Sequence, residues 1–130
     1  MTDTTPRYLN SGKVLPATLP FSEAVQLGNL LILSGQLGNL PGTLTLAPGG
    51  IAAETKQMME NIKTTLEAHG YSMANVIKCT AMLADMAEWP AFNAVYETYF
   101  DPSRKPARSA FGTSGLAVGA RIEMECMAAK

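Results

Sequence analysis

Two charged residues near the end of the chain have types and surroundings that suit a small anionic ligand. Arg108 stands among the small residues Ala107, Ser109 and Ala110, so its long side chain has room to reach into an open pocket. A guanidinium is planar, offers several N–H donors and stays charged at any working pH, which suits a carboxylate. Glu123 follows on a later segment and would complete an arginine–carboxylate site. The simpler alternative is a cross-strand ion pair of at most about 1 kcal/mol.

The segment from Pro106 to Ala128 is expected to form a β-hairpin that brings these two side chains together. Every second residue from Ile122 to Cys126 is apolar, so one face of that strand should meet a core. Glycine, serine and threonine interrupt the two strand-like runs. If the break closes as a four-residue loop at Ser114 to Ala117, Arg108 falls opposite Glu123 in an antiparallel ladder.

The composition indicates one acidic domain that associates with itself. The 130 residues correspond to a single domain, spanning residues 1–130. Only 16% of the residues are charged, against about 25% in typical proteins, so another subunit is expected to bury part of the surface. The net charge is −1 and the pI is near 5.8, so the chain does not have the excess of positive charge that is typical of a nucleic-acid-binding protein.

The remaining elements predict an α+β domain with a mixed six-stranded sheet and two helices on one face. No element is left to cover the other face, which is a second argument for self-association. Residues 1–7 are expected to be flexible. The expected strands and helices are Tyr8–Asn10, a hairpin of Phe21–Leu27 and Leu30–Gln36, a helix at Ile51–His69 ended by Gly70, Val76–Leu83, a helix from Pro90 to Phe100, and the terminal hairpin.

Few other residues suggest chemistry. Cys79 and Cys126 are far apart and have no histidine at ligand spacing, so we expect buried free thiols and no metal. His69, the only histidine, is interpreted as a helix-end residue whose ring suits the helix dipole. Nucleotide-binding, nucleophile-elbow and zinc-protease motifs are absent. The polar start and the lack of an apolar run of about 20 residues lead us to expect a cytoplasmic protein.

Several sequence blocks together resemble the Rid family of reactive-intermediate deaminases, also known as liver perchloric-acid-soluble proteins or endoribonucleases. The resemblance covers about Phe21 to Ala128. The blocks are Ala24-Val-Gln-Leu-Gly-Asn-Leu-Leu-Ile-Leu-Ser-Gly-Gln36, Asn93-Ala-Val-Tyr-Glu-Thr-Tyr-Phe100, Pro106-Ala-Arg-Ser109 and Gly119-Ala-Arg-Ile-Glu-Met-Glu125.

The resemblance implies a chorismate-mutase-like fold and a homotrimer with a central barrel and clefts between subunits. In each cleft an arginine, here Arg108, would bind the carboxylate of a 2-imino acid such as 2-aminoacrylate. Glu123 would help to hold the attacking water, and the products would be a 2-oxo acid and ammonia. No metal or cofactor is implied. The other residues expected to contact substrate are Phe21, Ser34, Gly35, Trp89, Asn93 and Ala110.

Two departures from the deaminase archetype keep other functions open. The archetype has a tyrosine where this chain has Phe21, and a cysteine where it has Ala110. Loss of the phenol favours a second hypothesis, a trimer that binds or senses small carboxylates without turnover. A third hypothesis is an endoribonuclease or translation inhibitor, which the acidic pI argues against.

Overall fold

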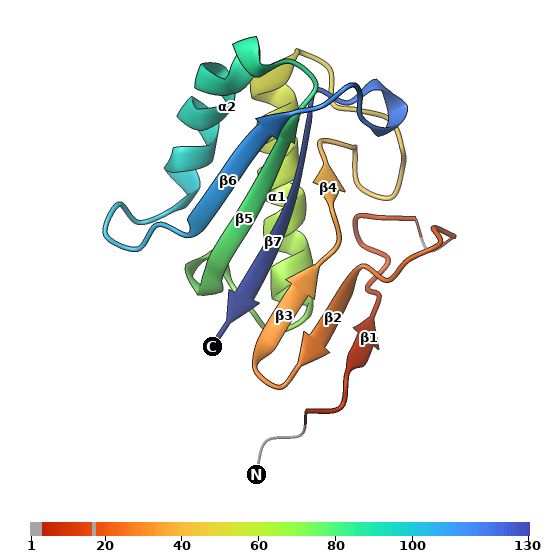
Figure 1. Cartoon of the computed structure of the whole chain (residues 1–130). Coiled ribbons are helices and arrows are strands. Elements are labelled where there is room, and N and C mark those ends of the chain that lie inside the picture. The colour runs from red at the N-terminus through yellow and green to blue at the C-terminus, as the bar shows by residue number, and fades with distance from the viewer. Residues whose placement is uncertain (1–3, 17) are drawn as a thin grey trace.

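Two helices pack against one face of a mixed β-sheet, as the α+β expectation requires. The structure is a computed structural model that describes residues 4–16 and 18–130. Seven strands form the sheet in the order β1-β2-β3-β7-β5-β6, with β4 paired to β7 (Figure 1). The elements are β1 Arg7–Leu9, β2 Ala24–Leu27, β3 Leu30–Leu33, β4 Gln36–Leu37, α1 Ile51–Ala68, β5 Val76–Leu83, α2 Trp89–Tyr96, β6 Ala107–Gly112 and β7 Ile122–Ala129.

The long helix α1 provides most of the contact with the sheet. Its apolar residues recur every three or four positions, so Met58, Ile62 and Leu66 form one stripe and are fully buried. The helix ends at Ala68, and Gly70 takes a positive φ of 83°. A residue with a Cβ rarely adopts that conformation, so the glycine allows the chain to turn back toward the sheet.

The expected strand Leu30–Gln36 is split into β3 and β4, so the sheet has seven strands instead of six. Against β7, Ile32 pairs with Met127, whereas Gln36 pairs with Met124. The pairing therefore advances four residues along the β3–β4 segment and three along β7. One extra residue interrupts the ladder at Ser34–Gly35 and bends the strand there, in the manner of a β-bulge.

The predicted terminal hairpin is wrong, because β5 lies between β6 and β7. Strand β5 is parallel to β6 and antiparallel to β7. Arg108 thus pairs with Cys79, and Glu123 pairs with Met82. The segment 113–121 is long enough to cross the end of β5, whereas the expected four-residue loop joins only neighbouring strands, about 4.8 Å apart.

Side chains from β5 and β7 complete the core beneath the helices. Ile122, Met124 and Cys126 face the core as expected, with at most 3% of their surface exposed. Cys79 and Cys126 are buried free thiols, which confirms the prediction. Their sulfur atoms lie 2.8 Å apart on paired positions of the two strands. This contact could not be predicted from the sequence, because the two cysteines are 47 positions apart.

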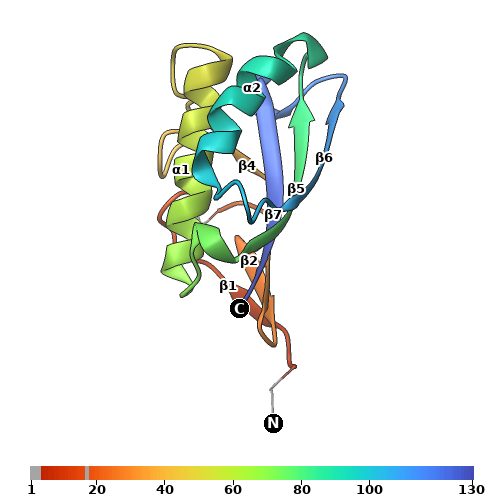
Figure 2. The ribbon, with the colours of Figure 1, turned by 90° about the vertical axis from the view of Figure 1, so that its left-hand side faces the viewer.

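The other face of the sheet carries no helix within the described part of the chain, and both helices lie on one side (Figure 2). Partly exposed apolar side chains remain on the strands, including Ile32, Phe111 and Met127. Of the expected flexible start at 1–7, residues 1–3 lie outside the described residues, and Arg7 already pairs with Gln26. Among the described residues, no helix is long and apolar enough to cross a membrane.

The buried stripe of α1 predicts that two substitutions on the same helix will change the free energy of unfolding by very different amounts. Leu66→Ala should destabilise the protein by about 2–5 kcal/mol, because it leaves a cavity beside the sheet. Lys63→Ala, on the exposed face, should change the stability by less than about 0.5 kcal/mol. Urea unfolding of both variants at one protein concentration checks this, and equal effects would contradict the packing described here.

Candidate functional site

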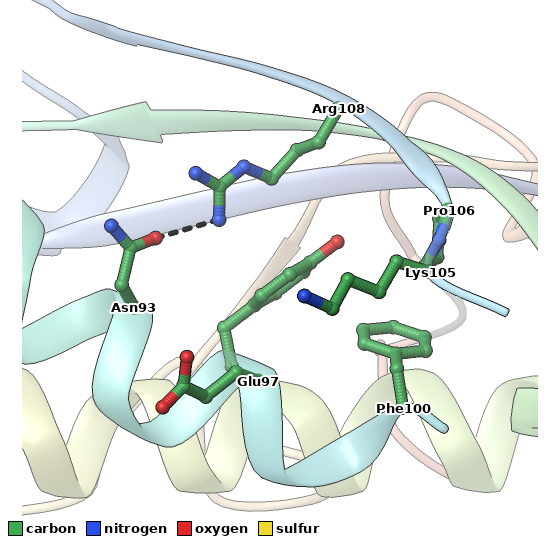
Figure 3. A pocket seen from close by; sticks show the side chains of 7 residues that line it. Asn93, Glu97, Phe100, Lys105, Pro106 and Arg108 are labelled. Carbon is green, nitrogen blue, oxygen red and sulfur yellow. Dashed lines mark hydrogen bonds between the residues drawn. The ribbon is translucent and has the colours of Figure 1, made fainter. Parts of the chain in front are cut away.

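Arg108 lies on the edge strand β6 and extends over helix α2. Its Nη1 donates a hydrogen bond of 2.6 Å to Oδ1 of Asn93 (Figure 3). Its guanidinium carbon lies 4.8 Å from the centre of the Tyr96 ring and 5.5 Å from that of Phe92. An arginine has five N–H donors, and this bond uses one of them. The rings and the amide hold the cation in place and leave other donors for a ligand.

A cavity of about 420 Å³ opens beside Arg108, between α2 and the start of β6. This volume lies within the range of small-molecule sites, roughly 300–1,000 Å³. Its walls combine aromatic rings, two cations and one carboxylate. The lining residues are Asn93, Tyr96, Glu97, Phe100, Lys105, Pro106 and Arg108 (Figure 3).

Glu123 is partly buried on β7, and its environment makes it a weaker acid than a free glutamate. Burial, and secondly the negative charge of Glu125, raise the pKa of the Glu123 carboxyl. Gly35 packs directly against this carboxylate, and a Cβ at position 35 would overlap Oε2 of Glu123. Any side chain at position 35 would therefore displace the carboxylate.

Arg108 and Glu123 lie on opposite faces of the sheet in this chain. Arg108 pairs with Cys79, which faces the core, and contacts rings of α2. Glu123 pairs with Met82, three residues beyond Cys79 on the same strand. Because neighbouring strand residues point to opposite faces, an offset of three reverses the face. The predicted single-face arrangement is therefore wrong, and one chain does not bring the two groups together.

Apart from Trp89, the other predicted site residues divide between the same two places. Asn93 and Ala110 belong with Arg108, since Ala110 is two residues further along β6 and packs partly buried against the core. Trp89 begins α2 one turn before Asn93, is 39% exposed and does not line the cavity. We call Asn93, Arg108 and Ala110, together with the cavity, the arginine half-site.

The second group is connected to Glu123 through Gly35. Gly35 contacts its carboxylate, and the hydroxyl of the adjacent Ser34 donates a 2.6 Å hydrogen bond to the carbonyl of Ser22. That bond ties Ser34 to the residue next to Phe21, whose side chain is 48% exposed. We call Phe21, Ser34, Gly35 and Glu123 the glutamate half-site.

Sequence reasoning missed most of the cavity wall. Tyr96, Glu97, Phe100 and Pro106 line the cavity but belong to no site predicted from the sequence. Lys105 lies close in the sequence to Arg104 and Arg108, and this cationic cluster is the signal that could have assigned it to the site. Within the described residues, no group of three or more His, Cys, Asp or Glu side chains could hold a metal ion.

Comparisons with known proteins agree on one family. The model of the family described as Endoribonuclease L-PSP matches residues 12–130. The chain is 38% identical over 122 residues to 2-iminobutanoate/2-iminopropanoate deaminase of Mus musculus, covering 94% of this chain and 90% of that protein. It is 40% identical to the protein of the same name from Capra hircus, covering 94% and 88%.

Solved structures give the same result. RidA from the Antarctic bacterium Psychrobacter sp. PAMC 21119 superposes with a TM-score of 0.88 at 32% identity, covering 95% of this chain and 99% of that chain. The yeast protein YEO7 superposes with a TM-score of 0.89 at 36% identity, covering 97% and 99%. These matches confirm the resemblance found in the sequence blocks. The chain belongs to the Endoribonuclease L-PSP family, which is the Rid family.

Proposed function

We propose that this protein hydrolyses reactive 2-imino acids, including the imine formed from 2-aminoacrylate, to 2-oxo acids and ammonia. The observation that carries the proposal is the arginine half-site. A partly buried guanidinium lies at the wall of a 420 Å³ cavity, and it has N–H donors that remain available to a ligand. The chain is also 38% identical to a protein named as an imine deaminase, over most of both lengths.

The substrate carboxylate binds to Arg108. A guanidinium can donate two parallel hydrogen bonds to the two carboxylate oxygens, which fixes the orientation of the molecule as well as its position. The ring faces of Phe92 and Tyr96 favour the cation, and Asn93 restrains it from one side. The Arg108 side chain therefore loses little rotational freedom when the substrate binds, which is the main advantage of a preorganised site.

Hydrolysis then needs a water molecule and a group that moves protons. Water adds to the carbon of the C=N bond, and one of its protons passes to the nitrogen. The resulting carbinolamine loses ammonia and leaves the C=O bond of the 2-oxo acid. The oxidation level does not change, so the reaction needs no redox cofactor. Glu123 is the proposed proton carrier, because its raised pKa brings it closer to neutral pH, where proton transfer in both directions is efficient.

The two half-sites meet between subunits of a homotrimer. One chain places Arg108 and Glu123 on opposite faces of its sheet, so a second copy has to supply the missing half. In a closed ring every interface joins one surface of a subunit to a different surface of the next, so three such clefts form. The partly exposed Ile32, Phe111 and Met127 supply apolar surface for the central barrel.

Two other functions remain to be separated from this one. Phe21 provides no hydroxyl for substrate or water, which favours a trimer that binds small carboxylates without turnover. The family description includes endoribonuclease, but a net charge of −1 gives little attraction for the phosphate backbone. Turnover of an imine distinguishes the deaminase from a binding protein, and salt-sensitive RNA binding would indicate the ribonuclease.

Arg108→Ala should abolish the acceleration of 2-oxo acid release from 2-aminoacrylate generated in situ. Removing the carboxylate anchor should lower kcat/KM by about 100-fold or more, because the charged hydrogen bonds and the fixed orientation are lost together. Arg104→Ala is the matched control, since it removes an exposed guanidinium four residues away. Light scattering should show an unchanged assembly. Full activity in the variant would mean that Arg108 does not anchor the substrate, and dissociation to monomers would mean that Arg108 is structural.

The raised pKa of Glu123 predicts an acid limb in the pH profile of kcat/KM. A carboxyl with a raised pKa becomes protonated at a higher pH than a free glutamate, whose pKa is about 4.3. As the pH is lowered, kcat/KM should therefore begin to fall at a pH above the one expected for a free glutamate. Glu125→Gln removes a like charge, lowers the pKa of Glu123 and should move the limb to lower pH. Glu123→Gln should remove most of the activity. A limb that does not move in Glu125→Gln would argue against Glu123 as the proton carrier.

A further inference from the structure

A buried acid–base pair joins the end of helix α1 to the residue just before β2, and the proposed chemistry does not use it. Nε2 of His69 lies 2.6 Å from Oε2 of Glu23. The side chain of Glu23 is 2% exposed and that of His69 is 10% exposed. Burying a carboxylate costs folding free energy unless the group is paired and hydrogen-bonded. The partners of Glu23 are therefore needed to keep its carboxylate in this buried position.

The carboxylate, the backbone amide and the backbone carbonyl of Glu23 all form hydrogen bonds. Its carboxylate accepts hydrogen bonds from the Ser11 hydroxyl at 2.9 Å and the Ser11 amide at 3.2 Å, besides the contact with His69. Its backbone amide donates to Oδ1 of Asn10 at 3.0 Å. Its backbone carbonyl accepts from the amide of Ser34 at 3.0 Å. Glu23 therefore connects the N-terminal segment, helix α1 and the glutamate half-site.

The connection to the glutamate half-site is short and continuous. Ser34 bonds to the carbonyl of Glu23 through its amide and to the carbonyl of Ser22 through its hydroxyl, at 2.6 Å. Gly35 follows directly and packs on the carboxylate of Glu123. A shift of Glu23 would thus move Ser34 and Gly35, and would change the space in which Glu123 sits.

The end of α1 is fixed well enough to act as the anchor. The helix packs its buried stripe on the sheet, and the Tyr71 hydroxyl that follows it donates a 2.9 Å bond to the carbonyl of Asn29 between β2 and β3. The C-terminal end of α1 consequently lies beside these strands (Figure 1). His69 is the C-cap residue of this fixed helix, and its ring contacts the carboxylate of Glu23.

We infer that His69 is a positioning residue for the proposed reaction: through Glu23 it holds Ser34 and Gly35 in the place that orients the Glu123 carboxylate. This inference rests on the proposed function and adds a residue to it. It differs from a purely structural role in one respect. A stabilising pair alone would change the stability and leave the kinetics of the folded protein intact, whereas a positioning pair changes the proton-transfer step selectively.

The kinetic test compares His69→Ala with His69→Gln in the assembled protein. In His69→Ala, kcat for imine hydrolysis should fall about tenfold, because misplacing a catalytic group by a fraction of an ångström has effects of this size. KM should stay within about twofold, since Arg108 still binds the carboxylate. His69→Gln keeps an N–H donor and should restore most of kcat. Glu67→Ala, an exposed change in the same helical turn, is the control and should match the wild type.

Two kinetic results would overturn the inference. One is an unchanged kcat in folded His69→Ala protein. The other is an equal loss of kcat in His69→Gln, which would show that the donor does not matter.

A measurement that does not depend on activity separates this inference from the proposed function. In amide NMR spectra of the assembled protein, the Ser34 and Gly35 resonances should shift in His69→Ala and return toward wild-type positions in His69→Gln. The Ala110 resonance, in the arginine half-site, should stay in place. If the wild type shows no imine hydrolysis while these shifts occur, the proposed reaction fails and the positioning of the half-site stands. Unmoved Ser34 and Gly35 resonances would overturn the inference.

Discussion

The placement of β5 between β6 and β7 is the constraint on which the rest of the site depends. It sets Arg108 against Cys79 and Glu123 against Met82, and so directs the two charged side chains to opposite faces of one sheet. A partly buried guanidinium and a carboxylate on one face would neutralise each other as an ion pair. Kept apart within the chain, each group retains hydrogen-bonding capacity for a ligand. The proposed chemistry would then require assembly to bring the two groups together.

The two half-sites are built by different physical means. The arginine half-site uses a cation held by aromatic ring faces and an amide, beside a cavity of about 420 Å³. The glutamate half-site uses close packing: Gly35 has no Cβ and so leaves the space that the carboxylate occupies, and burial raises the pKa of Glu123. The first suits the recognition of a charge that does not change in the reaction. The second suits a group that has to gain and lose a proton.

The sequence predicted local features better than long-range ones. The spacing of apolar residues located α1, and alternation placed Ile122, Met124 and Cys126 in the core, because both patterns are set by residues that are near in sequence. The strand order was missed, since a hairpin and a crossing over β5 start from similar loop residues. The His69–Glu23 pair was also invisible, because its partners are 46 residues apart. Arg108 was found from its surroundings and the family motif, whereas most of the cavity wall depends on how α2 packs against β6.

The most direct test of the shared site mixes two inactive variants, Arg108→Ala and Glu123→Gln, in one assembly by co-expression. A site shared between subunits predicts that equal amounts recover about a quarter of the wild-type imine hydrolysis, because random assembly joins the two intact halves in about that share of the clefts. Recovery requires no new contact, only an intact Arg108 from one chain facing an intact Glu123 from its neighbour. Mixed assemblies with no more activity than the separate variants would contradict the account.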